Sequence, residues 1–97
     1  MGKIIIIYNI IYHKDAIVDV KNIDKQILLR IKNSIENKLT ERPEIFAERL
    51  KHELKNYWKL RVGDYRVVFK IDGKIITILA IANRNKIYDK LKKRNKI

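Results

Sequence analysis

The chain lacks cysteine and has only one proline, three glycines and two histidines. Without cysteine, neither a disulfide-stabilised scaffold nor a thiolate site is possible. His13 and His52 are far apart in the sequence, and no residues around them have the spacing of metal ligands. We therefore expect no metal site and no cofactor.

The chain also lacks an apolar run long enough to cross a membrane. Its strongest candidate, Ile4–Ile11, is much shorter than the ~20 residues that a spanning helix needs. Only Lys3 precedes this run and no small-residue cleavage site follows it, which argues against a secretory signal. We expect a buried strand here, no membrane partner and a cytoplasmic location.

Acidic residues are few compared with basic ones: 11 Asp and Glu stand against 23 Lys and Arg, which gives a formal net charge of +12. In a small domain this excess indicates a polyanionic partner such as nucleic acid, an acidic protein or a membrane surface. Solvated faces in a lysine-rich proteome are the alternative explanation. With 97 residues, 46% of them hydrophobic, the chain fits one domain, residues 1–97, with a modest core.

Hydrophobic periodicity predicts a small α+β domain with the order β-α-α-β-β-β and a short C-terminal helix. Its helical hairpin should pack on a mainly antiparallel sheet. The clearest helix begins after the N-cap Asp24 and carries an apolar stripe at Ile27, Ile31, Ile35 and Leu39. The other predicted elements are a central or well-covered strand at 3–12, a helix at 14–21, a helical turn at 44–50 after Pro43, a loop at 51–56, strands at 57–62, 65–71 and 74–82, the last of them central, and a helix at 86–93.

Residues 55–66, KNYWKLRVGDYR, predict a hairpin with one cationic face. Tyr57, Lys59 and Arg61 alternate with apolar residues, as in a strand buried on one side. Gly63 and Asp64 supply the turn, so Arg66 on the return strand should lie close to Lys59 and Arg61. Fixed cations on a rigid sheet suit a polyanion, in particular a phosphate whose charge grows during a reaction. The cations that end the chain, Lys90, Lys92, Lys93, Arg94 and Lys96, should form a fraying tail.

Several segments resemble the RelE/ParE superfamily of toxin–antitoxin toxins. They are WKLRVGDYRVVF at 58–69, DGK at 72–74, ANR at 82–84 and Tyr88 four residues later. The resemblance covers about residues 8 to 93. It implies a toxin that cleaves messenger RNA in the ribosomal A site, by metal-free attack of the ribose 2′-hydroxyl on the adjacent phosphate. It also implies a RelB-like, acidic antitoxin as partner, alongside the ribosome and mRNA.

The same resemblance implies the catalytic residues Lys59, Arg66, Arg84 and Tyr88. Glu48 matches the position of a catalytic glutamate in the YoeB-like branch. Two departures matter: Tyr57 stands where some RelE enzymes carry a further lysine, and no histidine lies near the C-terminus.

The chemistry of these side chains indicates their roles. Arginine stays protonated, so Arg66 would stabilise charge on the phosphorane, and Arg84 would reach the same face from the loop after the last strand. Neighbouring cations disfavour the protonated form of Lys59, which would allow Lys59 to act as general base. The alternative is that Lys59 stays protonated and only contacts a phosphate. Glu48 competes for the role of base, and this choice stays open. Tyr88 would donate a proton, stack on a base or pack the terminal helix.

The remaining polar residues near the hairpin suit binding rather than chemistry. Lys51, Lys55 and Arg61 would contact phosphates without regard to sequence, and Tyr57 would stack on an unpaired base. Trp58 should lie in the core.

Two other functions fit the same pattern. One is a ParE-like poison of DNA gyrase, which needs no nuclease chemistry, and the other is a non-catalytic nucleic-acid-binding module. Lys59, Arg66, Arg84 and Tyr88 as a set favour the nuclease.

Overall fold

The computed structural model describes residues 5–94, so Lys3, Ile4 and Lys96, which the sequence placed in the first strand and the basic tail, lie outside the described residues. The elements follow in the order β1 (Asn9–Tyr12), α1 (Lys14–Val20), α2 (Lys25–Leu39), α3 (Pro43–Phe46), β2 (Glu48–Arg49), the single-turn 3-10 helix η1 (His52–Leu54), β3 (Trp58–Val62), β4 (Tyr65–Asp72), β5 (Ile75–Asn83) and α4 (Ile87–Lys93). This order confirms the predicted α+β fold.

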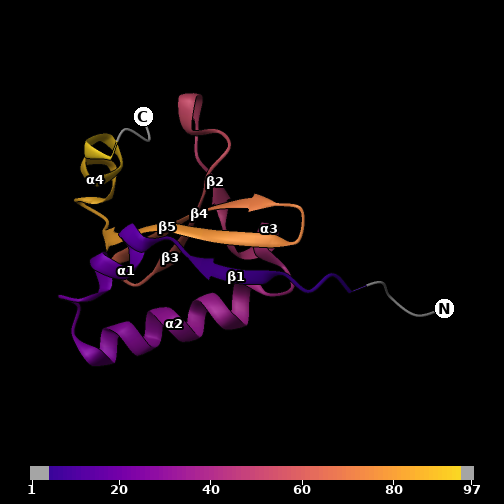
Figure 1. Cartoon of the computed structure of the whole chain (residues 1–97), viewed down its shortest axis with the longest axis horizontal. Helices are drawn as coiled ribbons and strands as arrows, with labels where there is room; N and C mark the ends of the chain where they lie inside the picture. Colours follow the sequence, from indigo (N-terminus) through magenta and orange to yellow (C-terminus); the bar gives the residue numbers. More distant parts are fainter. Residues whose placement is uncertain (1–4, 95–97) are drawn as a thin grey trace.

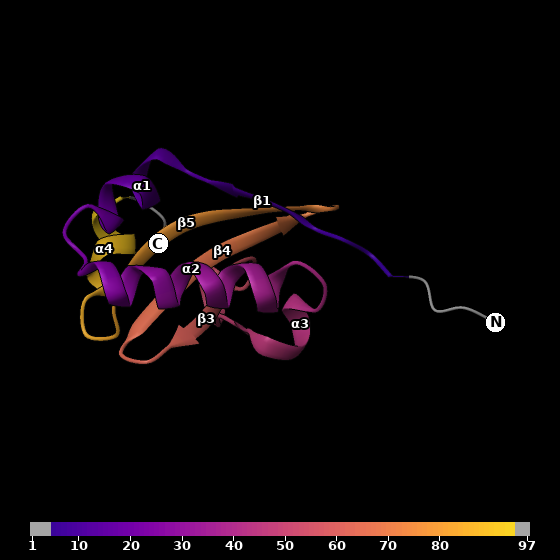
Figure 2. The same ribbon diagram turned by 90° about the horizontal axis from the view of Figure 1, so that it is seen from below.

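One mixed sheet organises these elements, with the strand order β1-β5-β4-β3-β2. Only β1 pairs in parallel, with β5, and the other three pairings are antiparallel. Helix α2 lies across one face of the sheet, while α4 and the loop that contains η1 rise from the other side (Figures 1 and 2). The sheet thus separates the side covered by α2 from the side on which α4 and the η1 loop lie.

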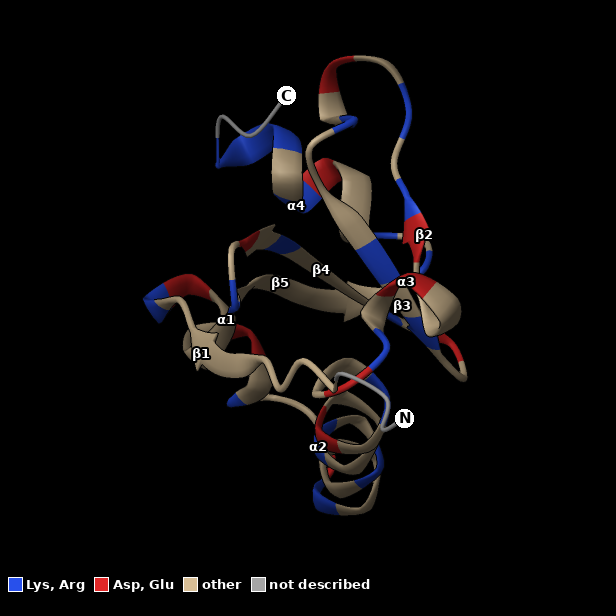
Figure 3. Ribbon diagram, turned by 90° about the vertical axis from the view of Figure 1, so that its right-hand side faces the viewer, with Lys and Arg blue, Asp and Glu red and all other residues tan. Residues whose placement is uncertain are grey.

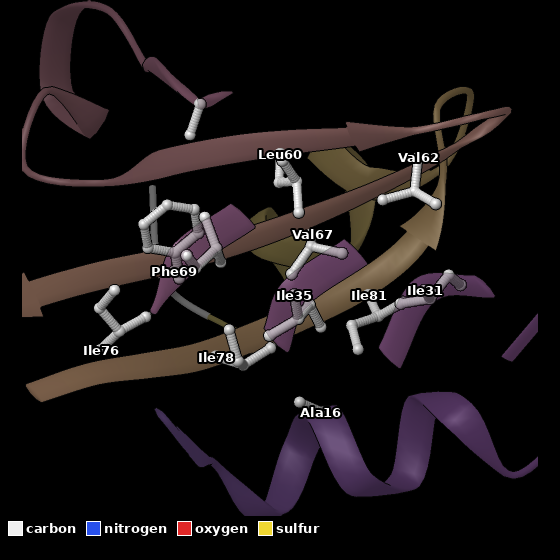
Figure 4. Close-up of a cluster of buried hydrophobic side chains, with 12 residues drawn as sticks. Ala16, Ile31, Ile35, Leu60, Val62, Val67, Phe69, Ile76, Ile78 and Ile81 are labelled. Atoms are coloured by element: carbon white, nitrogen blue, oxygen red, sulfur yellow. The ribbon is translucent and has the colours of Figure 1, made fainter. Parts of the chain in front are cut away.

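The larger core lies between α2 and the sheet. Asp24 caps α2 by accepting a hydrogen bond from the backbone N–H of Gln26 at 3.1 Å, as predicted. The predicted stripe is buried at Ile31, Ile35 and Leu39, but Ile27 in the first turn of α2 stays 39% exposed. Figure 4 shows how this core closes: Ile35 faces β-strand residues that include Leu60, Val67, Phe69 and Ile78.

A β-bulge in β5 changes the face of the sheet to which the residues after it point. Simple alternation would place Ile78 and Ala80 on one face, but the register between β4 and β5 shifts by one residue between Val68 and Phe69. Ile78 therefore packs in the α2-side core, while Ala80 packs beneath α4. The prediction that this strand is interior is confirmed, since β1 and β4 flank it.

The prediction of a long, well-covered first strand is wrong. β1 begins only at Asn9 and forms an edge of the sheet, with Ile11 50% exposed. The register explains its length: Asn9 pairs with Ile75, the first residue of β5, and β5 begins directly after the turn formed by Gly73 and Lys74, one residue later than the predicted Asp72–Gly73 turn. Residues 5–8 therefore have no partner strand alongside them.

The predicted helical turn at 44–50 is also wrong in its second half. Helix α3 ends at Phe46, and Ala47 is extended, with φ −118° and ψ 161°. Glu48 and Arg49 then pair with Lys59 and Trp58 as the short strand β2. Pairing with β3 prevails over the helical tendency of these residues.

Candidate functional site

The face of the sheet opposite α2 carries the cations of the hairpin. Trp58, Leu60 and Val62 point into the α2-side core, so the alternate residues Lys59 and Arg61 point to the other side, where α4 packs. Figure 3 shows Lys and Arg residues on β2, β3 and α4 and in the loop that follows β2. The predicted cationic face is therefore present.

Lys59 and Tyr88 meet on this face although 29 residues separate them. The Lys59 ammonium donates a long hydrogen bond of 3.4 Å to the Tyr88 hydroxyl oxygen and lies 5.9 Å from the centre of the Tyr88 ring. Tyr88 stands in the first turn of α4 and is 45% exposed. Because the oxygen accepts from Lys59, the phenolic proton of Tyr88 remains free to be donated elsewhere.

A cavity of about 500 Å³ opens beside this pair. Its lining combines β2, the η1 loop, β3 and α4, through Glu48, Arg49, Leu50, Lys51, His52, Glu53, Leu54, Lys59 and Tyr88. Glu48 is the direct cross-strand partner of Lys59, so both candidate bases lie at the same wall of the cavity. The structure thus brings Glu48, Lys59 and Tyr88 together.

Arg66 lies at the turn end of the hairpin, directly opposite Arg61 and diagonal to Lys59. Its Nη1 atom donates to the backbone carbonyls of Gly63 at 3.0 Å and Tyr65 at 2.9 Å. These two bonds use both protons of Nη1 and fix the guanidinium against the turn. The other edge, formed by Nε and Nη2, keeps two parallel donors.

Arg84 is held at the same end of the sheet. Its backbone N–H donates to the carbonyl of Asp64 at 2.8 Å, which ties the loop after β5 to the hairpin turn. Arg61, Arg66 and Arg84 therefore lie at the same end of the sheet, beside the turn. Lys59, which contacts Tyr88 at the cavity, stands on the same strand β3 as Arg61 and so lies between the cavity and the turn.

The predicted RNA contacts are only partly gathered around the cavity. Lys51 lines it, whereas Lys55 is exposed beyond the lining. Tyr57 packs against the small cluster beneath α4 and borders a separate cavity of about 560 Å³, on the side of Trp58 and Lys70. That second cavity contains none of the candidate catalytic side chains, so we centre the site on Lys59 and Tyr88.

Sequence reasoning gave no role to two residues that the structure singles out. His52 borders the cavity and has φ +57°, the only positive φ of a non-glycine residue within residues 5–94. Asp19 is a buried carboxylate bound by cations of α4 and the residue after it. No local sequence signal reveals either feature, because both depend on tertiary contacts.

In residues 5–94, no group of three or more His, Asp or Glu side chains could hold a metal ion. Over the same range, no helix combines the length and the apolar character that crossing a bilayer requires.

A protein-family model matches the sequence of this chain over residues 10–88. It describes the ParE toxin of the type II toxin–antitoxin system parDE. The chain belongs to this family. It is the toxin of a toxin–antitoxin pair, and the resemblance inferred from its sequence motifs is confirmed.

Solved structures of similar shape include toxins bound to antitoxins. The RelBE2 toxin–antitoxin complex from Mycobacterium tuberculosis superposes with a TM-score of 0.76 at 23% identity, over 81% of this chain and 93% of that one. The RelB–RelE complex from Methanococcus jannaschii gives 0.62 at 28% identity, over 82% and 96%. The DinJ–YafQ complex from E. coli gives 0.59 at 18% identity, over 84% and 97%. No curated protein matches this chain in sequence.

Each of these three structures is a complex of a toxin with its antitoxin. They share the fold at low identity and do not decide among the activities of the family. The choice of activity depends on the side chains of this chain.

Proposed function

We propose that this toxin is an endoribonuclease that cleaves mRNA in the ribosomal A site without a metal ion. The observation that supports it best is the contact of Lys59 with Tyr88 at one cavity wall, with Glu48 on the adjacent strand. A gyrase poison has no need of such a group. The excess of basic residues fits a substrate that is itself a polyanion.

The proposed reaction begins at the ribose 2′-hydroxyl, which attacks the adjacent phosphorus and breaks the bond to the 5′-oxygen of the next nucleotide. Glu48 or neutral Lys59 takes the 2′-hydroxyl proton. Tyr88 donates its phenolic proton to the leaving 5′-oxygen, because its own oxygen already accepts from Lys59. The products are a 2′,3′-cyclic phosphate and a 5′-hydroxyl.

The cations at the turn stabilise the charge that develops on the phosphorane. Arg66 is the best placed of them, since its bonds to the turn carbonyls orient the free Nε–Nη2 edge before substrate arrives. Arg84 assists from the loop after β5, and Arg61 contacts a neighbouring phosphate. Lys51 and Lys55 bind the RNA backbone on either side of the scissile phosphate. Tyr57 is partly buried, so its stacking on a base is a minor contribution.

The test is cleavage of mRNA on programmed ribosomes by purified protein, followed by analysis of the RNA ends. We expect 2′,3′-cyclic phosphate ends from the wild type and a rate lowered by about 10²-fold in Tyr88→Phe, the scale of losing one general acid. Tyr12→Phe, which removes a tyrosine hydroxyl on the edge strand β1, away from the cavity, is the matched control and should change the rate less than threefold. Ends with a 3′-hydroxyl would contradict attack by the 2′-hydroxyl.

The second candidate function is poisoning of DNA gyrase. The match of the ParE toxin model over residues 10–88 favours it. It predicts that substitutions at Lys59 and Tyr88 leave toxicity unchanged, since the target would be a protein.

A further inference from the structure

Asp19 is a buried charged side chain that the proposed chemistry does not use. It lies in the last turn of α1, and its side chain is only 1% exposed. Within the described residues it is the only charged or polar residue that is buried. A carboxylate in such a place is stable only if its oxygens are well bonded.

The partners of this carboxylate come from α4 and from β5. Lys90 donates to Oδ1 at 2.7 Å, and Arg94 donates to both oxygens through its two terminal nitrogens, at 3.0 Å for the bond to Oδ2. The backbone N–H of Ile81, just after the bulge of β5, donates to Oδ2 at 2.9 Å. One side chain thus joins α1, β5 and the C-terminal end of α4.

Helix α4 has few other contacts that fix its position. It has seven residues, and no side chain caps its N-terminus. A helix of this length is not stable alone in water. Only Ile87 and Leu91 are buried beneath it, against a small cluster that includes Ala80 and Ala82. Ile87 and Leu91 pack on one side of the helix against Leu50, Leu54, Val68, Ala80 and Ala82. Apolar packing has no preferred direction, whereas the hydrogen bonds to Asp19 do, so these bonds fix the orientation of the helix.

Tyr88 stands on this helix, on the surface that faces Lys59. We propose that Asp19 is a positioning residue for Tyr88: by binding Lys90 and Arg94, it holds α4 in the orientation that places the Tyr88 hydroxyl beside Lys59. This inference rests on the proposed nuclease function for its effect on rate. The positioning itself is a structural claim that can be tested without RNA.

The first experiment replaces Asp19 by Asn, which can still accept from the Ile81 N–H but loses the charge. We expect cleavage to fall by about tenfold or more, with substrate affinity unchanged, because Asp19 does not touch RNA. Asp24→Asn removes one exposed acidic charge and keeps the helix cap, so it serves as the matched control and should cleave like the wild type.

A double-mutant cycle separates positioning from a general loss of stability. In a Tyr88→Phe background, Asp19→Asn should lower the rate by less than twofold, because the group that it positions is already absent. A full additional loss in that background would overturn the proposal. An unchanged rate in the Asp19→Asn single variant, in a protein whose Tyr88→Phe variant is slow, would overturn it as well.

Arg94→Met gives a second route if Asp19→Asn does not fold. It keeps the Lys90 bond to Asp19 and removes three guanidinium bonds: two to Asp19 and one of 3.4 Å to the backbone carbonyl of Asp15. Lys93→Met, at the exposed neighbouring position, is its control. The readout is amide hydrogen exchange: exchange in α4 should accelerate at least tenfold in Arg94→Met, while β4 and β5 stay as protected as in the wild type.

The cleavage assays and the hydrogen-exchange measurement test the nuclease proposal and the positioning role of Asp19 separately. If the wild type does not cleave RNA but α4 exchange accelerates in Arg94→Met and the Tyr88 ring resonances shift, the nuclease proposal fails and the positioning by Asp19 stands. If α4 exchange and the Tyr88 resonances are the same in Arg94→Met and Lys93→Met, Asp19 does not position Tyr88, whatever the activity.

Discussion

Substitution of Arg66 by Ala tests how the hairpin stabilises the transition state. In the folded protein, both protons of Nη1 are bound to the carbonyls of Gly63 and Tyr65, and the Nε–Nη2 edge remains for a phosphate. The guanidinium is therefore oriented before RNA binds and needs no rearrangement during the reaction. Loss of one such preorganised stabiliser typically lowers kcat by about 10²–10³-fold, or ~3–4 kcal/mol. We expect a decrease of this size.

The fold should survive the substitution. Arg66→Ala removes two hydrogen bonds to turn carbonyls, each with a net contribution of about 1 kcal/mol. Arg66 is only partly buried, so water can replace part of this. We expect a loss of about 1 kcal/mol in the free energy of unfolding, measured by urea denaturation.

Arg61→Ala is the matched control, because Arg61 is the direct cross-strand partner of Arg66 on the same face. We expect it to weaken ribosome binding and to lower kcat by less than tenfold. Arg66→Lys should recover only part of the activity, since an ammonium cannot make two parallel bonds. If folded Arg66→Ala cleaves mRNA like the wild type, or if Arg61→Ala is equally slow, the reasoning about Arg66 is wrong.

Three further predictions follow from the charges and turns. Ribosome binding should weaken with salt, with a slope of log K against log salt steeper than about −2, since each phosphate contact contributes about −0.7; a flatter slope would contradict a multi-phosphate site. Burial by itself raises the pKa of Asp19, but hydrogen bonds from Arg94, Lys90 and the Ile81 N–H outweigh it and lower the pKa below 3.8. The stability that Asp19 contributes should therefore be complete above pH ~4 and lost as the pH falls below that. In urea denaturation, Asp19→Asn should cost about 2–3 kcal/mol at pH 7 and progressively less as the pH falls below ~4; a cost that does not change with pH would refute this. Gly63→Ala and Gly73→Ala should each cost about 1 kcal/mol, because both glycines have positive φ, +57° and +59°. Only Gly63→Ala should also slow cleavage, since the Gly63 carbonyl holds Arg66; equal slowing in both variants would contradict that role.

The elements that follow local rules were predictable from the sequence. The Asp24 cap, the buried stripe of α2 and the two Gly-containing turns agree with their patterns. Alternation along β3 placed Trp58 on the core side, where it stacks on Phe69 with Arg49 over its ring. These features depend on residues close together in the chain, which is why a pattern reveals them.

The errors occurred where distant segments decide the structure. The run of isoleucines before Asn9 suggests a buried strand, but β5 begins too late to pair with Ile5, Ile6 and Ile7. Glu48 and Arg49 look helical in sequence and form a strand because β3 offers a free edge.

The C-terminal cations show the same limit. Lys90 and Arg94 read as part of a fraying tail, yet they bind Asp19, more than 70 residues earlier in the chain. Arg66 was correctly expected near Arg61, but its bonds to the turn carbonyls, and hence its fixed orientation, could not be read from residue types alone.

The most direct test of the proposed activity compares the two candidate targets of this toxin. The protein is induced in cells, mRNA breaks are mapped by primer extension, and the purified protein is assayed against DNA gyrase for loss of supercoiling. The account predicts new mRNA ends within translated regions, absent in the Tyr88→Phe and Arg66→Ala variants, and full gyrase activity. Intact mRNA together with inhibited gyrase would contradict it and assign the toxin to the gyrase poisons.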